Sequence, residues 1–260
     1  ALLARRGVTI IPPKVEEGVA KYPDPSFIAR VASSVALRGR DLVGSRILVT
    51  AGPTREWIDP VRYISNPSSG LMGLEVALEA YARGAEVDIV YGVTSWEPPH
   101  VLRAWHTETT EEMAEKVAEL TGSTRYDAIV AAAAPLDFRP EKKAGEKIRS
   151  GITLELKLVP TPKVLEAIRF RPKILVAYAA ETTSEVDRLI ESARAKLEKY
   201  QADLVVANVV GSGDVGFSSK YVKAVLVEPG GFKVLDKILK EDLARLLMDH
   251  VASRLRVANP

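Results

Sequence analysis

The residues best suited to chemistry follow one apolar run near position 50. Ile47–Thr50 is typical of a buried parallel strand, and the loop behind it contains Arg62 and Asn66 before a Ser-Ser-Gly run at 68–70 begins a helical pattern. Backbone N–H groups at a helix start point at anions, and the helix dipole is positive there. The loop is much longer than a plain dinucleotide fingerprint, so it can hold more than a cofactor pyrophosphate.

Two later residues also stand where chemistry is expected. Asp137 follows the apolar stretch 127–134, which places it at the carboxyl end of a strand, where open sheets bind ligands. Lys147 lies in residues 139–149, a stretch with five basic residues, a glycine and no periodicity, as in a solvated, mobile loop. Such a loop can bring a charge over a reacting phosphate and exclude water from it.

The histidines do not indicate a metal centre. His100, His106 and His250 are far apart in the sequence, and no spacing of histidine with acidic residues suggests a site built by protein ligands. With no cysteine in the chain, disulfides, thiolate metal sites and a cysteine nucleophile are excluded.

The elements that must position these residues alternate between strand and helix. Apolar runs predict strands, and helical spacing of apolar residues predicts helices between them. Thr109 and Glu112 can form a capping box at the start of one helix. This order favours an α/β fold with a doubly wound, mostly parallel Rossmann-like sheet. We expect strands at 46–51, 86–91, 127–134, 173–179 and 203–209, and helices at 70–83, 184–199 and 238–255.

Two pieces interrupt the alternation. Residues 152–158 alternate between apolar and polar, like a half-buried strand, and 222–227 and 232–235 flank a Pro-Gly-Gly turn, like a hairpin. We expect them to form a small antiparallel subsheet beside the main sheet. Its apolar residues, Leu154, Leu156 and Leu158 against Val225 and Val227, predict a homodimer interface.

Composition excludes several classes of protein. The 260 residues are 47% hydrophobic and 27% charged, and the net charge is only +2, so neither disorder nor a nucleic-acid or membrane surface is indicated. No apolar stretch is long enough to span a bilayer, and no secretory signal pattern opens the chain. The default expectation is a cytoplasmic protein.

Residues 52–73, GPTREWIDPVRYISNPSSGLMG, closely resemble phosphopantothenoylcysteine synthetase, the ligase of coenzyme A synthesis. The resemblance continues at Ala131–Asp137, Glu146–Ile148, Tyr178–Thr182 and Val206–Asn208, and it covers roughly residues 44–255. A long, gapless match of this kind is far more specific than a lone Gly-rich fingerprint.

The resemblance implies a reaction and its substrates. CTP would activate the carboxylate of 4′-phosphopantothenate as an acyl-cytidylate and release pyrophosphate, after which L-cysteine would attack and CMP would leave. ATP is the less favoured nucleotide, and Mg²⁺ held mainly by the triphosphate is the expected cation. A site of this kind needs cations and fixed dipoles more than a covalent nucleophile.

The resemblance also implies roles for individual residues. Arg62 and Asn66 would bind substrate, and with Lys147 they would carry the catalytic steps. The residues implied in nucleotide binding are Gly52, Ser68, Ser69, Gly70, Ala132, Ala133, Asp137, Lys147, Thr161, Pro162, Lys163, Val164, Tyr178, Lys196 and Lys199.

The chain departs from the family pattern at three places. Thr161–Val164 stands where the family often has Asn-Pro-Asp-Ile, Tyr178 replaces a usual phenylalanine, and Val209 replaces a polar residue after Asn208. The first departure puts local contacts with the base in question, whereas Tyr178 can still pack on a nucleotide.

Residues 1–43 are expected to be an N-terminal extension and linker, and residues 44–260 the nucleotide-dependent synthetase domain. Many relatives are fused proteins whose first half is a flavin-dependent decarboxylase. Residues 1–25 resemble the tail of such a half, and the alternative is a simple extension.

Two other functions compete with the ligase. An NAD(P)-binding reductase could use the same scaffold, but no Gly-rich fingerprint follows the first strand, and Tyr91-Gly92 stand where a ribose-binding acid would be. A regulatory module could bind nucleotide without catalysis, but Asn66, Lys147 and Asp137 are all retained.

Overall fold

The computed structural model describes residues 3, 6–211, 214–217 and 219–258. The strands of its main sheet are β3 (Arg46–Ala51), β6 (Glu86–Tyr91), β7 (Arg103–His106), β8 (Ala128–Ala131), β11 (Ile174–Glu181), β12 (Leu204–Val209), β13 (Tyr221–Glu228) and β14 (Gly231–Leu239). Their order in this eight-stranded sheet is β14-β13-β12-β11-β8-β3-β6-β7. The strands from β12 to β7 run parallel, and β13 and β14 add to one edge as an antiparallel hairpin.

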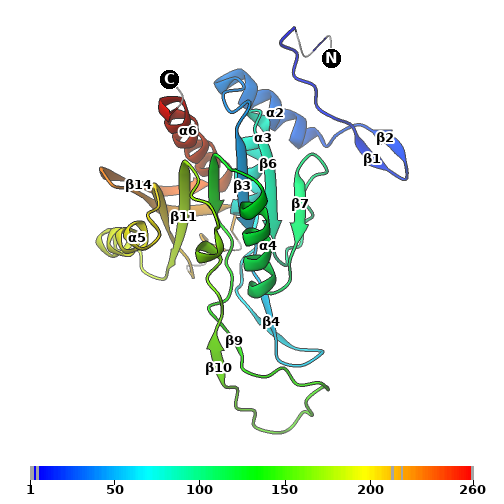
Figure 1. The fold of residues 1–260 in the computed structure, drawn as a ribbon, viewed down its shortest axis with the longest axis vertical. Coiled ribbons are helices and arrows are strands. Elements are labelled where there is room, and N and C mark those ends of the chain that lie inside the picture. The colour runs from blue at the N-terminus through cyan, green and yellow to red at the C-terminus, as the bar shows by residue number, and fades with distance from the viewer. Residues whose placement is uncertain (1–2, 4–5, 212–213, 218, 259–260) are drawn as a thin grey trace.

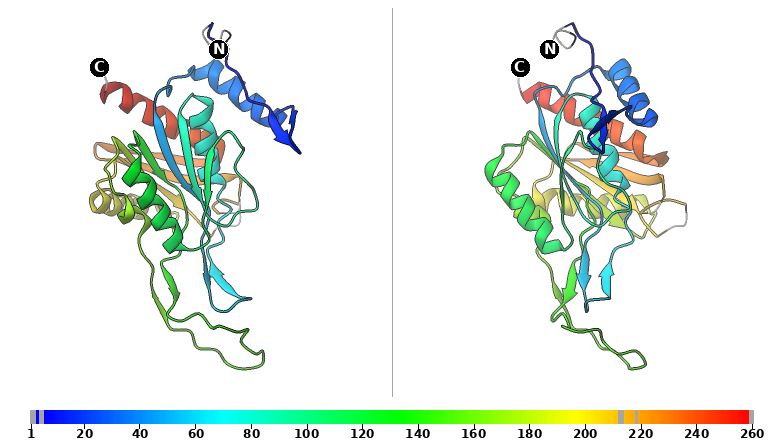
Figure 2. Two further views of the ribbon diagram at one scale, coloured as in Figure 1. Left: turned by 45° about the vertical axis from the view of Figure 1, so that its right-hand side comes forward. Right: turned by 90° about the vertical axis from the view of Figure 1, so that its right-hand side faces the viewer.

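Helices cover both faces of this sheet (Figures 1 and 2). One face packs on α3 (Leu71–Ala82) and α6 (Lys240–Ala258), and the other packs on α4 (Thr110–Ser123), α5 (Val186–Tyr200) and the 3₁₀ turn η1 (Val164–Ala167). Alternation along β3 divides its side chains, because Ile47 and Val49 join the first core while Leu48 joins the second. The predicted doubly wound α/β sheet is confirmed.

Local signals placed several helices correctly. Thr109 and Glu112 form the expected capping box at the start of α4. The terminal helix begins at Lys240, two residues later than the apolar pattern indicates, because β14 continues to Leu239. In the described part of the chain no helix is both long and apolar enough to cross a membrane.

The predicted subsheet does not form as expected. The hairpin exists, but β13 pairs with β12, so Val225 and Val227 are only 1% exposed in the core beneath α5. Residues 152–157 form no strand, and Leu154 and Leu156 remain exposed. The alternating pattern therefore marks a segment without a partner strand, and the expected interface between its leucines and the buried Val225 and Val227 is wrong.

Four short strands instead form an arm beyond the carboxyl ends of β3 and β8. They are β4 (Arg55–Trp57) with β5 (Tyr63–Ser65), and β9 (Phe138–Pro140) with β10 (Leu158–Pro160), each an antiparallel pair. The loop 141–157 extends from β9 and β10 away from the body (Figure 1). The arm therefore follows β3 and β8, and it carries the Arg62 and Lys147 regions away from the core.

The N-terminal segment contains more structure than a linker. A small hairpin, β1 (Lys14–Glu16) with β2 (Val19–Lys21), precedes helix α2 (Pro25–Arg38). Helix α2 is capped by Asp24 and packs against α3. Whether residues 1–43 act as a separate linker stays a prediction.

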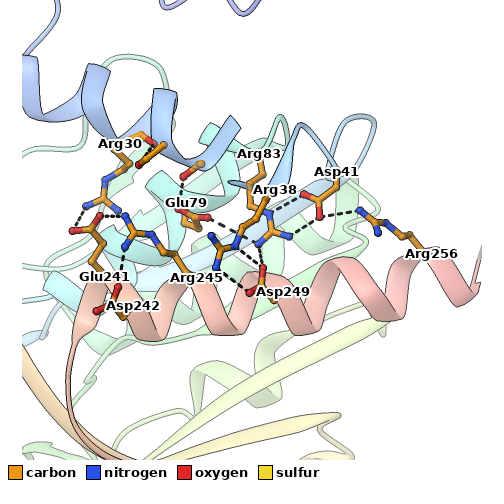
Figure 3. A network of polar contacts seen from close by, with 12 residues as sticks. Arg30, Arg38, Asp41, Glu79, Arg83, Glu241, Asp242, Arg245, Asp249 and Arg256 are labelled. Carbon is orange, nitrogen blue, oxygen red and sulfur yellow. Dashed lines mark hydrogen bonds and ion pairs between the residues drawn. The ribbon is translucent and has the colours of Figure 1, made fainter. Parts of the chain in front are cut away.

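A network of ion pairs joins α2, α3 and α6 (Figure 3). Its centre is Arg83, which is 1% exposed and donates to both oxygens of Asp41 and, at 2.6 Å, to Asp249. Asp249 also accepts from Arg38, and Asp41 from the exposed Arg256. The Arg38 and Arg83 guanidiniums hold the pKa of Asp249 below its ordinary value despite the opposing effect of burial.

Replacing Arg83 with methionine should destabilise the domain by about 3 kcal/mol, because it leaves Asp41 and Asp249 partly buried without their main partner. Arg256→Met is the matched control, since Arg256 contacts the same Asp41 from the surface and should change stability by only about 0–1 kcal/mol. Urea unfolding of the two variants measures the difference. Equal free energies of unfolding for the two variants would show that the buried position of Arg83 adds nothing to the stability of the domain.

Candidate functional site

A cavity of about 450 Å³ lies at the carboxyl ends of β3, β8, β11 and β12. This is where open α/β sheets bind ligands, as expected. Most of the residues predicted from the sequence meet here. They are Asn66, Ser68, Gly70, Ala132, Ala133, Asp137, Lys163, Val164, Tyr178, Lys196 and Lys199.

Two threonines fix one wall of the cavity through the backbone. Thr50 Oγ1 accepts from the Ala133 N–H at 3.2 Å, and Thr54 Oγ1 accepts from the Leu136 N–H at 3.0 Å. The Ala134 N–H donates to the Gly52 carbonyl at 2.9 Å. The segment after β8 is thus tied to the loop after β3, and the backbone at Ala132 and Ala133 is held in place.

Helix α3 begins unusually close to β3. A Cβ on Gly73 would lie 2.5 Å from Ala51 Cβ and 2.9 Å from the Thr50 carbonyl oxygen. Gly70 has φ +72° and its missing Cβ would lie 2.9 Å from Gly52 Cα. Gly52 therefore supports the helix start from below and does not line the cavity.

The two serines before α3 have different partners. Ser68 Oγ accepts from the Gly70 N–H at 3.2 Å, whereas Ser69 Oγ donates to the Phe217 carbonyl at 2.7 Å. Trp96 donates its indole N–H to the Ser69 carbonyl at 2.8 Å. Ser68 thus stays on the cavity wall, and Ser69 anchors the Phe217 segment beside it. The first N–H groups of α3 have no intrahelical acceptors, so this end suits an anion.

The Asn66 side chain is positioned by the segment after β8. Its Nδ2 donates to the carbonyls of Ala134 and Pro135, at 3.1 and 3.2 Å. The amide oxygen forms no hydrogen bond with the described residues, so it remains an acceptor that a substrate N–H can use.

Four lysines line the cavity, and they differ in their partners. Lys163 pairs with Asp137 at 2.5 Å, and Lys199 pairs with Glu166 at 3.0 Å. Lys196 instead donates to the Tyr178 carbonyl at 2.6 Å, and burial lowers its pKa. The fourth is Lys240.

Lys240 was not identified from the sequence. Its Nζ donates to the Phe217 carbonyl at 3.2 Å, it is 5% exposed, and burial lowers its pKa to about 8 although the Glu75 carboxylate opposes this. A lysine at a helix start usually faces solvent, and no local pattern distinguishes this one. Asn208, Tyr200 and Phe217 also line the cavity; of these, the sequence indicated only Asn208.

Tyr178 places a buried hydroxyl in this wall. No described residue bonds its oxygen, and burial raises its pKa far above the ordinary value. Thr161 and Pro162 lie next to the cavity but do not line it. The Thr161 N–H donates to the Asp137 carbonyl at 3.0 Å, so this turn positions Asp137 and Lys163.

Arg62 and Lys147 lie on the arm and do not line the cavity. Asp59, which is fully buried, accepts from the N–H groups of Val61, Arg62 and Ile148. Arg62 pairs with Asp59 at 2.9 Å and also donates to the Ile148 carbonyl. Asp59 and Arg62 therefore fix the backbone of Ile148, the residue next to Lys147, while the Lys147 side chain is exposed.

Comparison with known proteins identifies the family. Residues 42–255 match the DNA/pantothenate metabolism flavoprotein C-terminal domain. The chain belongs to this family. It is also similar to proteins named coenzyme A biosynthesis bifunctional protein CoaBC. The protein from Thermococcus kodakarensis is 41% identical over 97% of this chain, and the one from Escherichia coli is 34% identical over 97%.

The chain spans 62% and 64% of the lengths of these two relatives. A crystal structure of the C-terminal domain of a CoaBC protein is 30% identical, covers 84% of this chain and 98% of its own, and superposes with a TM-score of 0.67. A Cab2 mutant in complex with phosphopantothenate-cysteine is 18% identical, with 92% of this chain and 97% of its own covered, and shares the fold with a TM-score of 0.65.

Proposed function

We propose that this chain is the phosphopantothenate–cysteine ligase of coenzyme A biosynthesis. The main support for this proposal is the cavity, which combines a helix start suited to anions, the Asn66 amide and four lysines in a member of this family. A relative named for coenzyme A biosynthesis is 41% identical, and a protein of the same fold is named as a complex with phosphopantothenate-cysteine. These names support the same reaction for this chain.

The reaction has two steps. The carboxylate of 4′-phosphopantothenate attacks the α-phosphorus of a nucleoside triphosphate, the bond to the β-phosphate breaks, and pyrophosphate leaves. The amine of L-cysteine then attacks the acyl carbon, an amide forms, and the nucleoside monophosphate leaves. Both steps move negative charge, so positioned cations and N–H groups are the main requirement.

The described residues suit these requirements in distinct ways. Ser68 and the start of α3 would bind phosphate, and Asn66 would orient the acyl group. The backbone at Ala132 and Ala133, together with Asp137, would hold the nucleoside. Arg62 holds the backbone next to Lys147, so it would set the path by which the arm brings Lys147 over the phosphates.

We propose CTP as the nucleotide and Mg²⁺ as its cation. Within the described residues, no group of three or more histidine, aspartate or glutamate side chains is arranged to hold a metal ion. A cation carried by phosphate oxygens and water fits such a cavity, because Mg²⁺ keeps waters and binds phosphates readily.

The function is tested by measuring pyrophosphate release with CTP and with ATP, each with and without phosphopantothenate and cysteine. The ligase releases pyrophosphate only when phosphopantothenate is present. Binding of NADPH without CTP binding would favour the reductase, and CTP binding without a single turnover would favour the regulatory module.

Asn66→Asp and Asn66→Ala should damage the second step more than the first, because the amide that Ala134 and Pro135 hold in place would orient the acyl group. One turnover of pyrophosphate release should continue, and the acyl-nucleotide should accumulate. Quenched-flow analysis of the intermediate is the measurement. A variant that binds both substrates but forms no intermediate would assign Asn66 to activation instead.

Lys147→Gln should slow formation of the acyl-nucleotide by about 10²–10³-fold, as expected for loss of a cation opposite developing negative charge. Stability should change by only about 0–1 kcal/mol, because the side chain is exposed. Lys142→Gln is the matched control from the same loop, and it should keep the wild-type rate. Single-turnover kinetics that are identical for all three proteins would remove Lys147 from the mechanism.

We also propose two partnerships. The family description is that of a flavoprotein's C-terminal domain and its relatives are named bifunctional, which supports action beside a flavin-dependent phosphopantothenoylcysteine decarboxylase. The arm supports a homodimer, because it exposes a run of apolar side chains, namely Val61, Tyr63, Phe138, Ile152, Leu154, Leu156 and Leu158.

Leu156→Lys should convert the dimer to a monomer, because it would place a charge within the apolar face of the arm. Phe232→Lys is the control, since Phe232 is also exposed but lies on β14, an edge strand of the main sheet that is not part of the arm. Sedimentation equilibrium at micromolar concentration distinguishes the outcomes. A monomeric wild type rejects the dimer, and dissociation by Phe232→Lys alone moves the interface to β14.

A further inference from the structure

Lys240 is the buried cation of the cavity that the proposed mechanism has not used. It begins α6 immediately after β14, on the face of the sheet that α3 also covers (Figure 1). Its ammonium group has three N–H donors, and its one hydrogen bond to the described residues goes to the Phe217 carbonyl. It therefore keeps donors that a ligand in the cavity can use.

The charge of Lys240 is not balanced by a carboxylate. Lys163 and Lys199 are each neutralised by an acid, but no ion pair joins Lys240 to any acidic residue in the described chain. The Glu75 carboxylate acts on it from α3, but Glu75 is itself paired with Arg30. Burying a cation in this state is costly, so an anion entering the cavity would be held strongly.

The Phe217 carbonyl connects Lys240 to the phosphate-binding end of α3. It accepts from Ser69 Oγ at 2.7 Å and from Lys240 Nζ at 3.2 Å. The two donor atoms therefore lie no farther apart than the sum of these distances. Lys240 is thus aimed at the same end of the cavity as the Ser68–Gly70 turn, while Lys196 reaches its wall from α5.

We propose that Lys240 binds the polyphosphate of the nucleoside triphosphate at the start of α3. This inference rests on the proposed function, and it adds a residue that the sequence resemblance did not assign. When the bond between the α- and β-phosphates breaks, negative charge grows on the departing pyrophosphate. An ammonium held beside it stabilises that charge and leaves the cysteine step unaffected.

The test compares ligands that differ only in their phosphates. Calorimetry with CTP, CMP, cytidine and inorganic pyrophosphate in the presence of Mg²⁺ gives the affinities of wild type and Lys240→Met. We expect CTP and pyrophosphate to bind about 10- to 100-fold more weakly to the variant, the usual value of one charged hydrogen bond. Cytidine should bind equally well to both proteins, and Lys240→Arg should recover most of the lost affinity.

Lys237→Met is the matched control. Lys237 pairs with Asp214 at 2.6 Å, so its loss loosens the segment that contains Phe217 without removing a cation from the cavity. If it lowers CTP affinity as much as Lys240→Met does, Lys240 only anchors that segment and the proposal is wrong. Equal weakening of all four ligands by Lys240→Met would also overturn the proposal. The ratio of CTP to cytidine affinity does not depend on the fraction of protein that is folded.

Failure of the ligase function and failure of the Lys240 role give different results. If wild type binds none of CTP, ATP and pyrophosphate, both the ligase and the role of Lys240 are rejected. If wild type binds CTP and forms the acyl-nucleotide while Lys240→Met matches it in CTP affinity and in the rate of the first step, only the role of Lys240 is rejected.

Discussion

The close approach of α3 to the end of β3 is the constraint on which the site depends. Gly73 lies where any Cβ would collide with Ala51, and Gly70 turns the chain with a positive φ directly over Gly52. Because the helix start packs closely onto the sheet, its first N–H groups, which have no intrahelical acceptors, lie at the carboxyl ends of the strands. The serine turn, the Trp96 indole bond and the Phe217 segment all take their positions from this contact.

One wall of the cavity is fixed by hydrogen bonds to the backbone, and this affects the chemistry that the site can support. Thr50 and Thr54 fix the segment after β8, and that segment in turn fixes Asn66 through two carbonyls. Groups already bonded in place do not need to reorganise when charge develops in a reaction. The charges that complete the cavity come from the long side chains of the four lysines that line it.

The sequence predicted what is decided locally. The apolar runs placed the parallel strands, and Thr109 with Glu112 placed a helix start, because both patterns reflect neighbours along the chain. The prediction of a strand at 152–157 was wrong because an alternating apolar pattern forms a strand only where another strand lies beside it. Val225 was expected at an interface for a related reason. The sequence does not show that β13 pairs with β12, and this pairing buries Val225 in the main sheet. Lys240 could not be found, because its surroundings include the Phe217 segment and Glu75 on α3, which no pattern around position 240 reveals.

The network around Arg83 has a consequence for the order in which the chain folds. Arg38 and Asp249 are 211 positions apart, so α2 and α6 can close on one another only after nearly the whole domain has been synthesised. Contacts of such separation carry a loop-closure cost that local contacts avoid. Helix α2 can first pack on α3, where Ser34 donates a hydrogen bond to Glu79. Helix α6 then adds its ion pairs to α2. Contacts between α2 and α6, which are far apart in the sequence, therefore form late and complete the packing of these helices.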